Sequence, residues 1–214
     1  MKDRPRSLKV EAEREARKKM LQQEHMLPLT RFVNKIRKDK GPDKKIPFFD
    51  PLDGGTGARC LFVLEAPGRK AVESGFISRN NNDQSAENFF ECTVLAGLTR
   101  ERTITWNIVP WYLGTGRKVR AAKKPDIKLG TPYLLRLTRL LPRLRVIVLV
   151  GGKAQTVETE LRLRLKGVDI IQTLHPSPKA LNRKQENKKV LIRQLKQVRK
   201  ALDHRSRKNR RGPQ

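Results

Sequence analysis

From residue 59 onward, the sequence alternates between short apolar runs and stretches with helical periodicity. The apolar runs, which we take as strands, cover 59–65, 102–109, 144–150 and 168–174. The helical stretches between them cover 84–97, 131–141 and 152–164. Strands separated by helices of this length favour right-handed βαβ crossovers, which place the strands in parallel. We therefore predict an α/β fold around a mostly parallel four-stranded sheet.

The segments outside this pattern are strongly polar. Residues 1–45 are predicted to form a basic N-terminal helical extension and linker, in which a charged helix over 7–24 has little apolar face and lies on the surface or projects. The globular domain is predicted to span 46–202 and to end in a helix over 184–202. Residues 203–214 carry too few apolar groups to fold and are expected to form a disordered basic tail.

The net charge of the chain indicates the class of partner that it binds. Lys and Arg number 49 and Asp and Glu number 21, for a formal net charge of +28. A chain this basic is expected to bind polyanions, and nucleic acid is the first candidate. A ribosome-associated protein and a protein that binds anionic membranes are the alternatives. The sequence contains no long apolar span and no signal-peptide core, so we expect no membrane partner.

The chain has two cysteines and three histidines, and their spacing fits no metal site. We predict no metal, no iron–sulfur cluster and no other cofactor. Cys60 and Cys92 are predicted to be small core residues. A reducing, bacterial-type cytoplasm suits such a chain, and DNA binding would place it on the nucleoid.

Polar residues follow three of the predicted strands. Glu65 ends the first strand, Asn107 lies at the end of the second, and His175-Pro176-Ser177-Pro178 follows the fourth. The prolines stiffen the loop after the histidine. In a parallel sheet these ends meet at one edge, where α/β proteins bind ligands. Taken singly, each residue also fits an ordinary loop or strand-end cap.

Five motifs together resemble the uracil-DNA glycosylase superfamily over residues 58–200, in the family's order along the chain. Glu65-Ala66-Pro67-Gly68 resembles its first motif, in particular the branch that reads Gly-Glu-Ala-Pro-Gly. Asn107 resembles the base-reading asparagine, and His175-Pro176-Ser177-Pro178 resembles the histidine motif. Ser74-Gly75-Phe76 corresponds to the segment with the stacking aromatic, and Gly151-Gly152-Lys153-Ala154-Gln155 resembles the phosphate loop.

The resemblance implies a three-layer α/β/α sandwich and a monofunctional, monomeric DNA glycosylase. Such an enzyme hydrolyses the N-glycosidic bond of uracil in single- or double-stranded DNA and leaves an abasic site, after the nucleotide has left the base stack. Asn107 would bond N3–H and O4 of uracil. A neutral His175 would donate to O2, Phe76 would stack on the base, and the backbone of Ala66, Pro67 and Gly68 would contact the base.

The same resemblance implies a set of DNA contacts. Lys153 and the amides of Gly151 and Gly152 would bind a phosphate. Ser177, Pro178, Lys179 and Leu181 lie where the family inserts a wedge into the duplex, and Leu181 is the candidate wedge because Lys179 replaces the leucine of some members. The basic termini would add non-specific affinity that depends steeply on salt.

Two departures from the family pattern bear on chemistry and specificity. Ala66 stands where some branches have a water-activating aspartate, so a general base would be Glu65 or Glu73, with Asp83 as a third choice, or would be dispensable in a dissociative cleavage. Glu73 equally fits an ordinary surface carboxylate. Gly68 replaces a tyrosine that blocks the C5 side of the pyrimidine, so the pocket is expected to admit thymine, hypoxanthine or xanthine as well.

Two other functions stay open on the sequence alone. One is a catalytically weak relative that binds DNA or abasic sites without cleavage. The other is a basic α/β protein that associates with RNA or the ribosome, which the net charge supports equally well.

Overall fold

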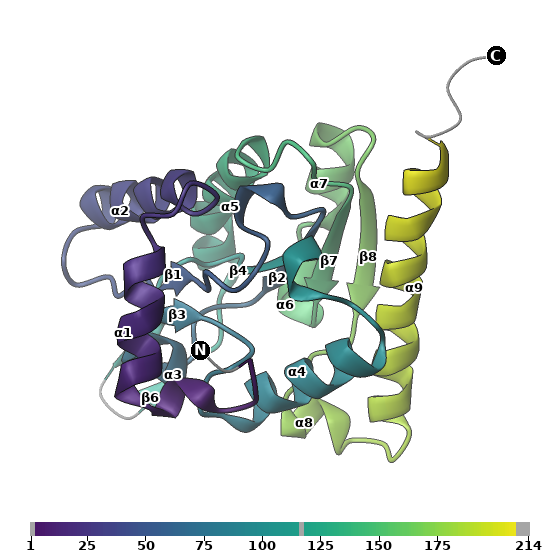
Figure 1. Ribbon diagram of the computed structural model, residues 1–214, viewed down its shortest axis with the longest axis horizontal. Coiled ribbons are helices and arrows are strands. Elements are labelled where there is room, and N and C mark those ends of the chain that lie inside the picture. The colour runs from purple at the N-terminus through teal and green to yellow at the C-terminus, as the bar shows by residue number, and fades with distance from the viewer. Residues whose placement is uncertain (1–2, 116–117, 209–214) are drawn as a thin grey trace.

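The computed structural model describes residues 3–115 and 118–208 of the chain. Its centre is a four-stranded sheet of order β4-β2-β7-β8, in which every neighbouring pair is parallel (Figure 1). The strands are β2 (Cys60–Leu64), β4 (Thr103–Asn107), β7 (Val146–Val150) and β8 (Asp169–Thr173). Each lies inside its predicted range, so the predicted parallel sheet is confirmed.

Successive side chains on these strands point to opposite faces and build two separate cores. On β2, Leu61 and Val63 enter the core covered by α2 (Leu27–Lys40), α5 (Lys124–Arg139) and α7 (Glu158–Arg164). Cys60 and Phe62 enter the other core, which α4 (Gln84–Leu95) and α9 (Asn187–Lys208) cover. The molecule is therefore the predicted three-layer α/β/α sandwich (Figure 1).

Shorter elements connect these layers. The helical ones are η1 (Ser7–Lys9), α1 (Glu11–Met20), η2 (Gly55–Gly57), α3 (Arg69–Ser74), η3 (Arg100–Arg102), α6 (Gly152–Gln155) and α8 (Pro178–Leu181). Two short strand pairs flank the sheet: β1 (Phe48–Phe49) is parallel to β3 (Phe76–Ile77), and β5 (Gly114–Thr115) is antiparallel to β6 (Lys118–Val119).

Three helix boundaries differ from the prediction. The stretch at 152–164 forms two helices, α6 and α7, and α9 continues to Lys208, past the predicted domain end at residue 202. The rest of the predicted tail, 209–214, lies outside the described residues. Helix α5 begins at Lys124 instead of residue 131, because Pro125 stands in its first turn and the Asp126 carboxylate accepts a hydrogen bond from the Lys123 N–H (2.8 Å).

Helix α5 lies directly against the chain that follows β4. A Cβ atom at Gly130 would be 2.0 Å from the main-chain oxygen of Ile108, so only glycine allows this approach. The contact fixes the path of the chain just beyond Asn107, the last residue of β4.

The sequence left open whether the N-terminal helix lies on the surface or projects, and the structure packs this segment onto the globular domain. Leu29, Val33 and Ile36 of α2 are fully buried in the first core. Helix α1 is mostly exposed, as predicted, but Arg17 is fully buried.

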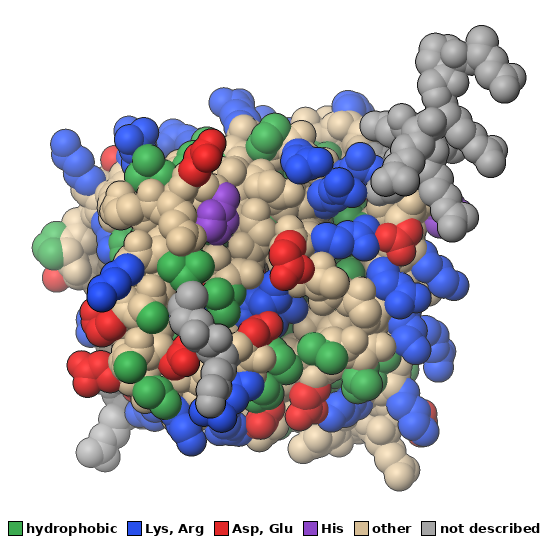
Figure 2. Space-filling model, in the orientation of Figure 1, with side chains coloured by type: hydrophobic (Ala, Val, Ile, Leu, Met, Phe, Trp, Pro, Cys, Tyr) green, Lys and Arg blue, Asp and Glu red, His purple; other side chains and the backbone are tan. Residues whose placement is uncertain are grey.

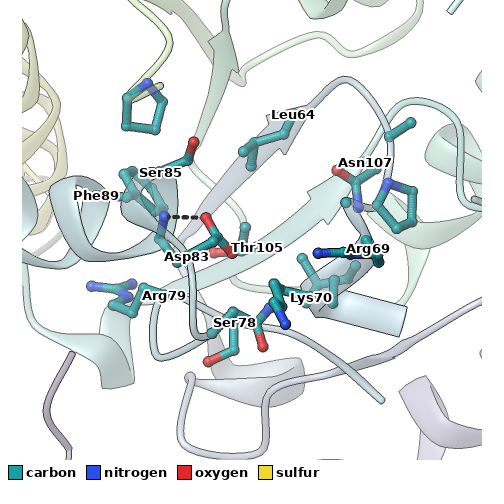
Figure 3. A pocket seen from close by; sticks show the side chains of 18 of the residues that line it. Leu64, Arg69, Lys70, Ser78, Arg79, Asp83, Ser85, Phe89, Thr105 and Asn107 are labelled. Carbon is teal, nitrogen blue, oxygen red and sulfur yellow. Dashed lines mark hydrogen bonds between the residues drawn. The ribbon is translucent and has the colours of Figure 1, made fainter. Parts of the chain in front are cut away.

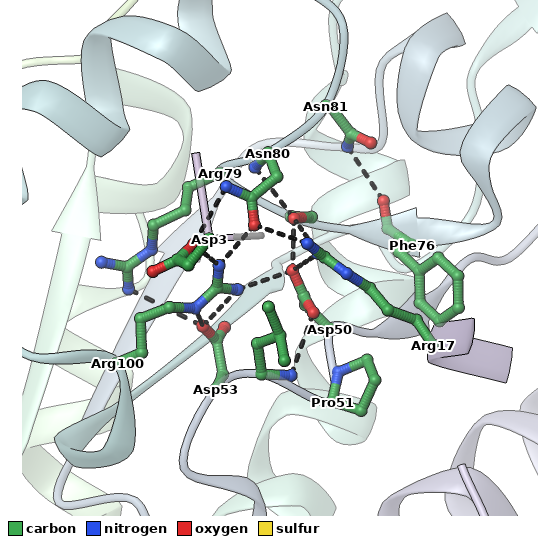
Figure 4. A network of polar contacts seen from close by, with 12 residues as sticks. Asp3, Arg17, Asp50, Pro51, Asp53, Phe76, Arg79, Asn80, Asn81 and Arg100 are labelled. Carbon is green, nitrogen blue, oxygen red and sulfur yellow. Dashed lines mark hydrogen bonds and ion pairs between the residues drawn. The ribbon is translucent and has the colours of Figure 1, made fainter. Parts of the chain in front are cut away.

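Arg17 joins a buried network of ion pairs and hydrogen bonds (Figure 4). Its Nη1 donates to Asp50 Oδ2 at 2.5 Å, and Nη2 donates to the Asn80 side chain at 3.0 Å. Arg100 donates to the same Asp50 oxygen at 2.6 Å and to Asp53 at 3.0 Å. Burial opposes ionisation of Asp50, but Arg100 and Arg17 hold the pKa of its carboxyl below the ordinary value. The network therefore ties α1 to the loops at 50–53 and 78–81.

The network predicts that Arg17→Ala destabilises the fold strongly. The substitution leaves the buried Asp50 charge without one of its partners, and losing half of such a pair lowers the free energy of unfolding by about 3–5 kcal/mol. Lys18→Ala is the matched control, because Lys18 lies on the same helix and pairs with Glu15 in solvent. Chemical denaturation of both variants measures the difference; a similar, small effect of both substitutions would contradict the prediction.

Candidate active site

A cavity of about 290 Å³ opens at the carboxyl ends of β2 and β4, on the α4 side of the sheet (Figure 3). This volume is at the lower end of the ~300–1,000 Å³ range of small-molecule sites. The residues that matter most for its chemistry are Ala66, Pro67, Gly68, Ile77, Arg79, Asp83, Phe89, Thr105, Asn107 and His175. The sheet thus brings the predicted asparagine, histidine and first motif to one place.

Asn107 ends β4, level with Leu64 of β2. Only 3% of its surface is exposed, and its side-chain amide bonds no other described residue. A ligand that offers both a donor and an acceptor would satisfy this amide.

His175 follows β8, and the main chain fixes which ring nitrogen carries its proton. The Ser177 N–H donates to His175 Nδ1 at 3.1 Å. Since Nδ1 accepts this bond, the neutral ring carries its proton on Nε2. Burial lowers the pKa of His175, against the opposite effect of the Glu65 and Asp83 charges. The site therefore holds a neutral imidazole with Nε2–H as its donor.

Contacts with α4, with α9 and with the residue before α6 hold the main chain that carries this imidazole. Asn88 of α4 donates to the main-chain oxygen of Pro176 (2.9 Å), and Gln194 of α9 accepts from the main-chain N–H of residue 174 (2.9 Å). Gly151, which precedes α6, has φ +80°, and a Cβ there would be 3.0 Å from the Cβ of His175. The main chain on both sides of His175 is thus bonded to neighbouring helices, and the side chain packs against Gly151.

The predicted first motif forms the turn between β2 and α3, and Ala66, Pro67 and Gly68 all line the cavity. A Cβ at Gly68 would meet no atom within 4 Å, so this side of the cavity is open. Arg69 and Lys70 follow at the start of α3 and also line the cavity. Their charges favour an anionic ligand near the opening.

The prediction that Phe76 stacks on a base is wrong. The ring is fully buried against Leu8 and Leu21 and does not line the cavity. Side chains alternate along β3, so the next residue, Ile77, faces the cavity instead. Ile77 and Phe89 of α4 supply apolar walls there.

Of the three carboxylates predicted as a general base, two lie outside the cavity. Glu65 does not line the cavity, because its side chain turns away to accept a hydrogen bond from the Ala122 N–H (2.5 Å). Glu73 lies on the exposed side of α3, where it pairs with Lys70 at 2.6 Å. Asp83, the third choice, does line the cavity, and its Oδ1 caps α4 by accepting from the Ala86 N–H at 2.9 Å. Of the three, Asp83 alone is placed to act on a ligand.

The predicted DNA-contact residues fall into two groups. The first group is accessible: Gly152, Lys153 and Lys179 are exposed. Gly151 lies against His175, so this group is close to the cavity, and its contact with DNA stays a prediction. Ser177 caps α8 by accepting from the Ala180 N–H, and Pro178 begins that helix.

Leu181 is the exception among these residues. It is buried in the core beneath α9, with 6% of its surface exposed. The prediction that it forms a wedge is therefore wrong, because the side chain would have to leave the core to reach DNA.

Sequence reasoning missed several cavity residues, among them Arg79, Phe89 and Thr105. Thr105 lies two residues before Asn107 on β4, so strand alternation alone would have placed it on the same face. Arg79 is fully buried and donates to the side chains of Thr93 (3.0 Å) and Thr103 (2.7 Å). No local pattern in the sequence indicates this position.

Cys60 and Cys92 are unpaired and buried in the second core, as predicted. Within 3–115 and 118–208, His, Cys, Asp and Glu form no group of three that would bind a metal ion. No helix in the described part of the chain has the length and apolarity of a membrane span.

Comparisons with known proteins agree with this arrangement. The family model of the uracil DNA glycosylase superfamily matches residues 51–199. The crystal structure of wild-type SMUG2 from Pedobacter heparinus is similar in fold, with a TM-score of 0.54, 14% identity and coverage of 86% of each chain. A comparison with curated proteins found no match.

The histidine geometry predicts an unusual titration. In NMR spectra at pH 7, His175 should carry its proton on Nε2, and its midpoint should lie below the ordinary 6.5 because burial disfavours the charged ring. At a pH between the lowered pKa of His175 in the folded protein and its ordinary pKa in the unfolded chain, the unfolded chain binds a proton that the folded protein does not. The free energy of unfolding should therefore decrease as pH falls below about 6.5, and less so in His175→Gln. A midpoint above 6.5 would contradict this prediction.

Proposed function

The chain belongs to the uracil-DNA glycosylase superfamily, and we propose that it is a monofunctional DNA glycosylase that releases uracil and leaves an abasic site. The observation that carries this proposal is the pair formed by an unbonded, buried Asn107 amide and the Nε2–H of His175 in one small cavity. An amide suits N3–H and O4 of uracil, and the imidazole suits a carbonyl on which negative charge develops.

In the proposed reaction the nucleotide leaves the duplex and its base enters the cavity. The Asn107 carbonyl accepts from N3–H, and its NH₂ donates to O4. As the bond between C1′ and N1 breaks, its electron pair goes to the base and the negative charge spreads to O2. Nε2–H of His175 donates to this oxygen, and one such donor is worth roughly 3–4 kcal/mol of barrier.

Water then supplies the hydroxyl group of the abasic sugar, and we assign its orientation to Asp83. This carboxylate lines the same cavity as His175, and its Oδ1 is anchored by the start of α4. Its negative charge would also stabilise the positive charge that develops on the sugar. The proton lost by the water is taken up by solvent or by the departing base, so the reaction yields free uracil and an abasic site.

The charge distribution supports DNA as the partner. Arg69 and Lys70 line the cavity near its opening, and Lys153 and Lys179 are exposed on the segments that hold His175. Figure 2 shows further Lys and Arg side chains along the side of the molecule formed by α9. These groups would bind phosphates and bring the cavity to the strand.

The first test measures uracil excision. With a uracil-containing oligonucleotide, alkali should cut at the uracil after treatment with the wild-type protein. His175→Ala should reduce the single-turnover rate about 100- to 1,000-fold, because it removes the donor to O2. Asn107→Ala should reduce the rate at least about 10-fold through loss of base contacts.

His25→Gln is the matched control for His175, because His25 bonds the Pro51 main chain and does not line the cavity. It should keep full activity, and the two cavity variants should keep their affinity for DNA. Binding without cleavage by the wild-type protein would favour a DNA- or abasic-site-binding relative, and a preference for RNA would favour an RNA-associated protein.

A second test separates the carboxylates. Asp83→Asn keeps a side chain that can cap α4 but removes the negative charge, and we expect excision to fall about 100-fold or more. Glu73→Gln, on the exposed side of α3, should leave the rate unchanged. Equal excision rates for the wild-type protein and Asp83→Asn would contradict the role of Asp83 and would mean that the attacking water needs no carboxylate to orient it.

A further inference from the structure

A second hollow, the basic groove, is lined among others by Arg37, Lys44, Lys45, Val72 and Gly75. Its volume is about 460 Å³. The first three residues belong to the end of α2 and the loop that follows it, and the last two to the end of α3 and the residue after it. The first turn of α3 lines the candidate active site instead. One short helix therefore separates the two hollows.

The basic groove lies at the same edge of the sheet as the cavity. The Tyr112 N–H donates to the main-chain oxygen of Lys45 at 2.9 Å, which joins the loop 41–47 to the chain that leaves β4 shortly after Asn107. On its other side the groove is bounded by α3, which begins just after the turn that follows β2. A helix with its side chains is about 10–12 Å across, so ligand atoms in the groove and in the cavity would lie roughly that far apart.

The charged residues that line the basic groove are all cationic: Arg37, Lys44 and Lys45. No Asp or Glu lines it, and Asp43 on the same loop is exposed outside it. Within the described part of the chain, neither Lys44 nor Lys45 forms an ion pair. A hollow with charges of one sign on its walls concentrates positive potential and attracts an anion.

Arg37 is held in the wall of the groove, whereas Lys44 and Lys45 are exposed. Nε of Arg37 donates to the main-chain oxygen of Ile46 at 2.9 Å, and its guanidinium carbon lies 3.9 Å from the centre of the Phe48 ring. Nη2 donates to the same Ile46 oxygen, and Nη1 bonds no other described residue. A fixed guanidinium beside two adaptable ammonium groups suits the phosphate group of a nucleic acid backbone.

We propose that the basic groove binds a backbone phosphate of the DNA strand whose nucleotide enters the cavity. This inference rests on the proposed glycosylase function and adds a binding site for the flanking strand. Each DNA strand carries one charge per about 3.4 Å of helix axis, so a separation of about 10–12 Å places this phosphate roughly three nucleotides from the everted one. Because the groove lies on one side of α3, the contact falls on one side of the everted nucleotide.

The experiment measures binding of a duplex that contains a tetrahydrofuran abasic analogue, which offers no base to excise. The groove variant Lys44→Gln/Lys45→Gln removes two positive charges from an exposed loop. It should weaken binding roughly 10-fold near about 0.1 M salt, and reduce the slope of log Kd against log salt by about 1, because one phosphate loses its partners.

Lys35→Gln/Lys38→Gln is the matched control variant. It removes the same charge from exposed positions on α2 that do not line the basic groove. It should weaken binding less than about 3-fold and leave the salt slope unchanged. The comparison separates a phosphate contact in the groove from a general loss of positive charge.

A second measurement locates the contact on the strand. Uncharged methylphosphonate linkages replace the phosphates singly on both sides of the abasic analogue. Substitution about three nucleotides away on one side should weaken binding by the wild-type protein and by the control variant. The groove variant should be insensitive to the same substitution.

The outcomes distinguish this inference from the proposed function. Equal affinities of the groove and control variants would overturn the inference, and so would a groove variant that keeps the wild-type sensitivity to every methylphosphonate. Neither result bears on uracil excision, for which the groove variant should keep the single-turnover rate at saturating enzyme within about 3-fold, because neither lysine lines the cavity. A wild-type protein that binds the abasic duplex without excising uracil overturns the proposed function alone.

Discussion

The parallel pairing of β2 with β4 and β7 is the constraint on which the site depends. It directs the carboxyl ends of all four strands to one edge of the sheet. Because Leu64 and Asn107 are level in the register, the turn that begins after β2 lies beside the asparagine. The histidine reaches the same edge from β8, two strands away from β2. Residues distant in the sequence thus form one cavity through backbone pairing, without a metal ion or disulfide among the described residues.

The segment before the family match supports the opposite wall of this cavity. The family model begins at residue 51, yet Arg17 and Asp50 bond residues inside the matched range, including Asn80 and Arg100. Asn80 adjoins Arg79, which lines the cavity. Removing these charges from water is costly, and in the folded protein each buried carboxylate is paired with a guanidinium. The N-terminal helices are therefore part of the architecture that shapes the site.

The sequence was sufficient for the parallel sheet and for two central polar residues, because strand runs and strand ends are local signals. Asn107 and His175 followed from this reasoning together with the family resemblance. Phe76 was misplaced because a two-residue strand gives no periodicity from which to choose its inward face, and Ile77 took the cavity position. Arg17 was not identified because one buried guanidinium in a charged helix depends on Asp50 and Asn80, which are distant in the sequence.

The hydrogen bond from the Ser177 main chain to His175 has a consequence for how this site tolerates change. A histidine whose tautomer is set by a neighbouring carboxylate loses that control when the carboxylate is replaced. Here the donor is a peptide N–H, which nineteen of the twenty common residues possess. Replacing Ser177 with any common residue except proline preserves the donor, provided that the loop keeps its path. The proton position is thus encoded in backbone conformation and is largely shielded from side-chain mutation.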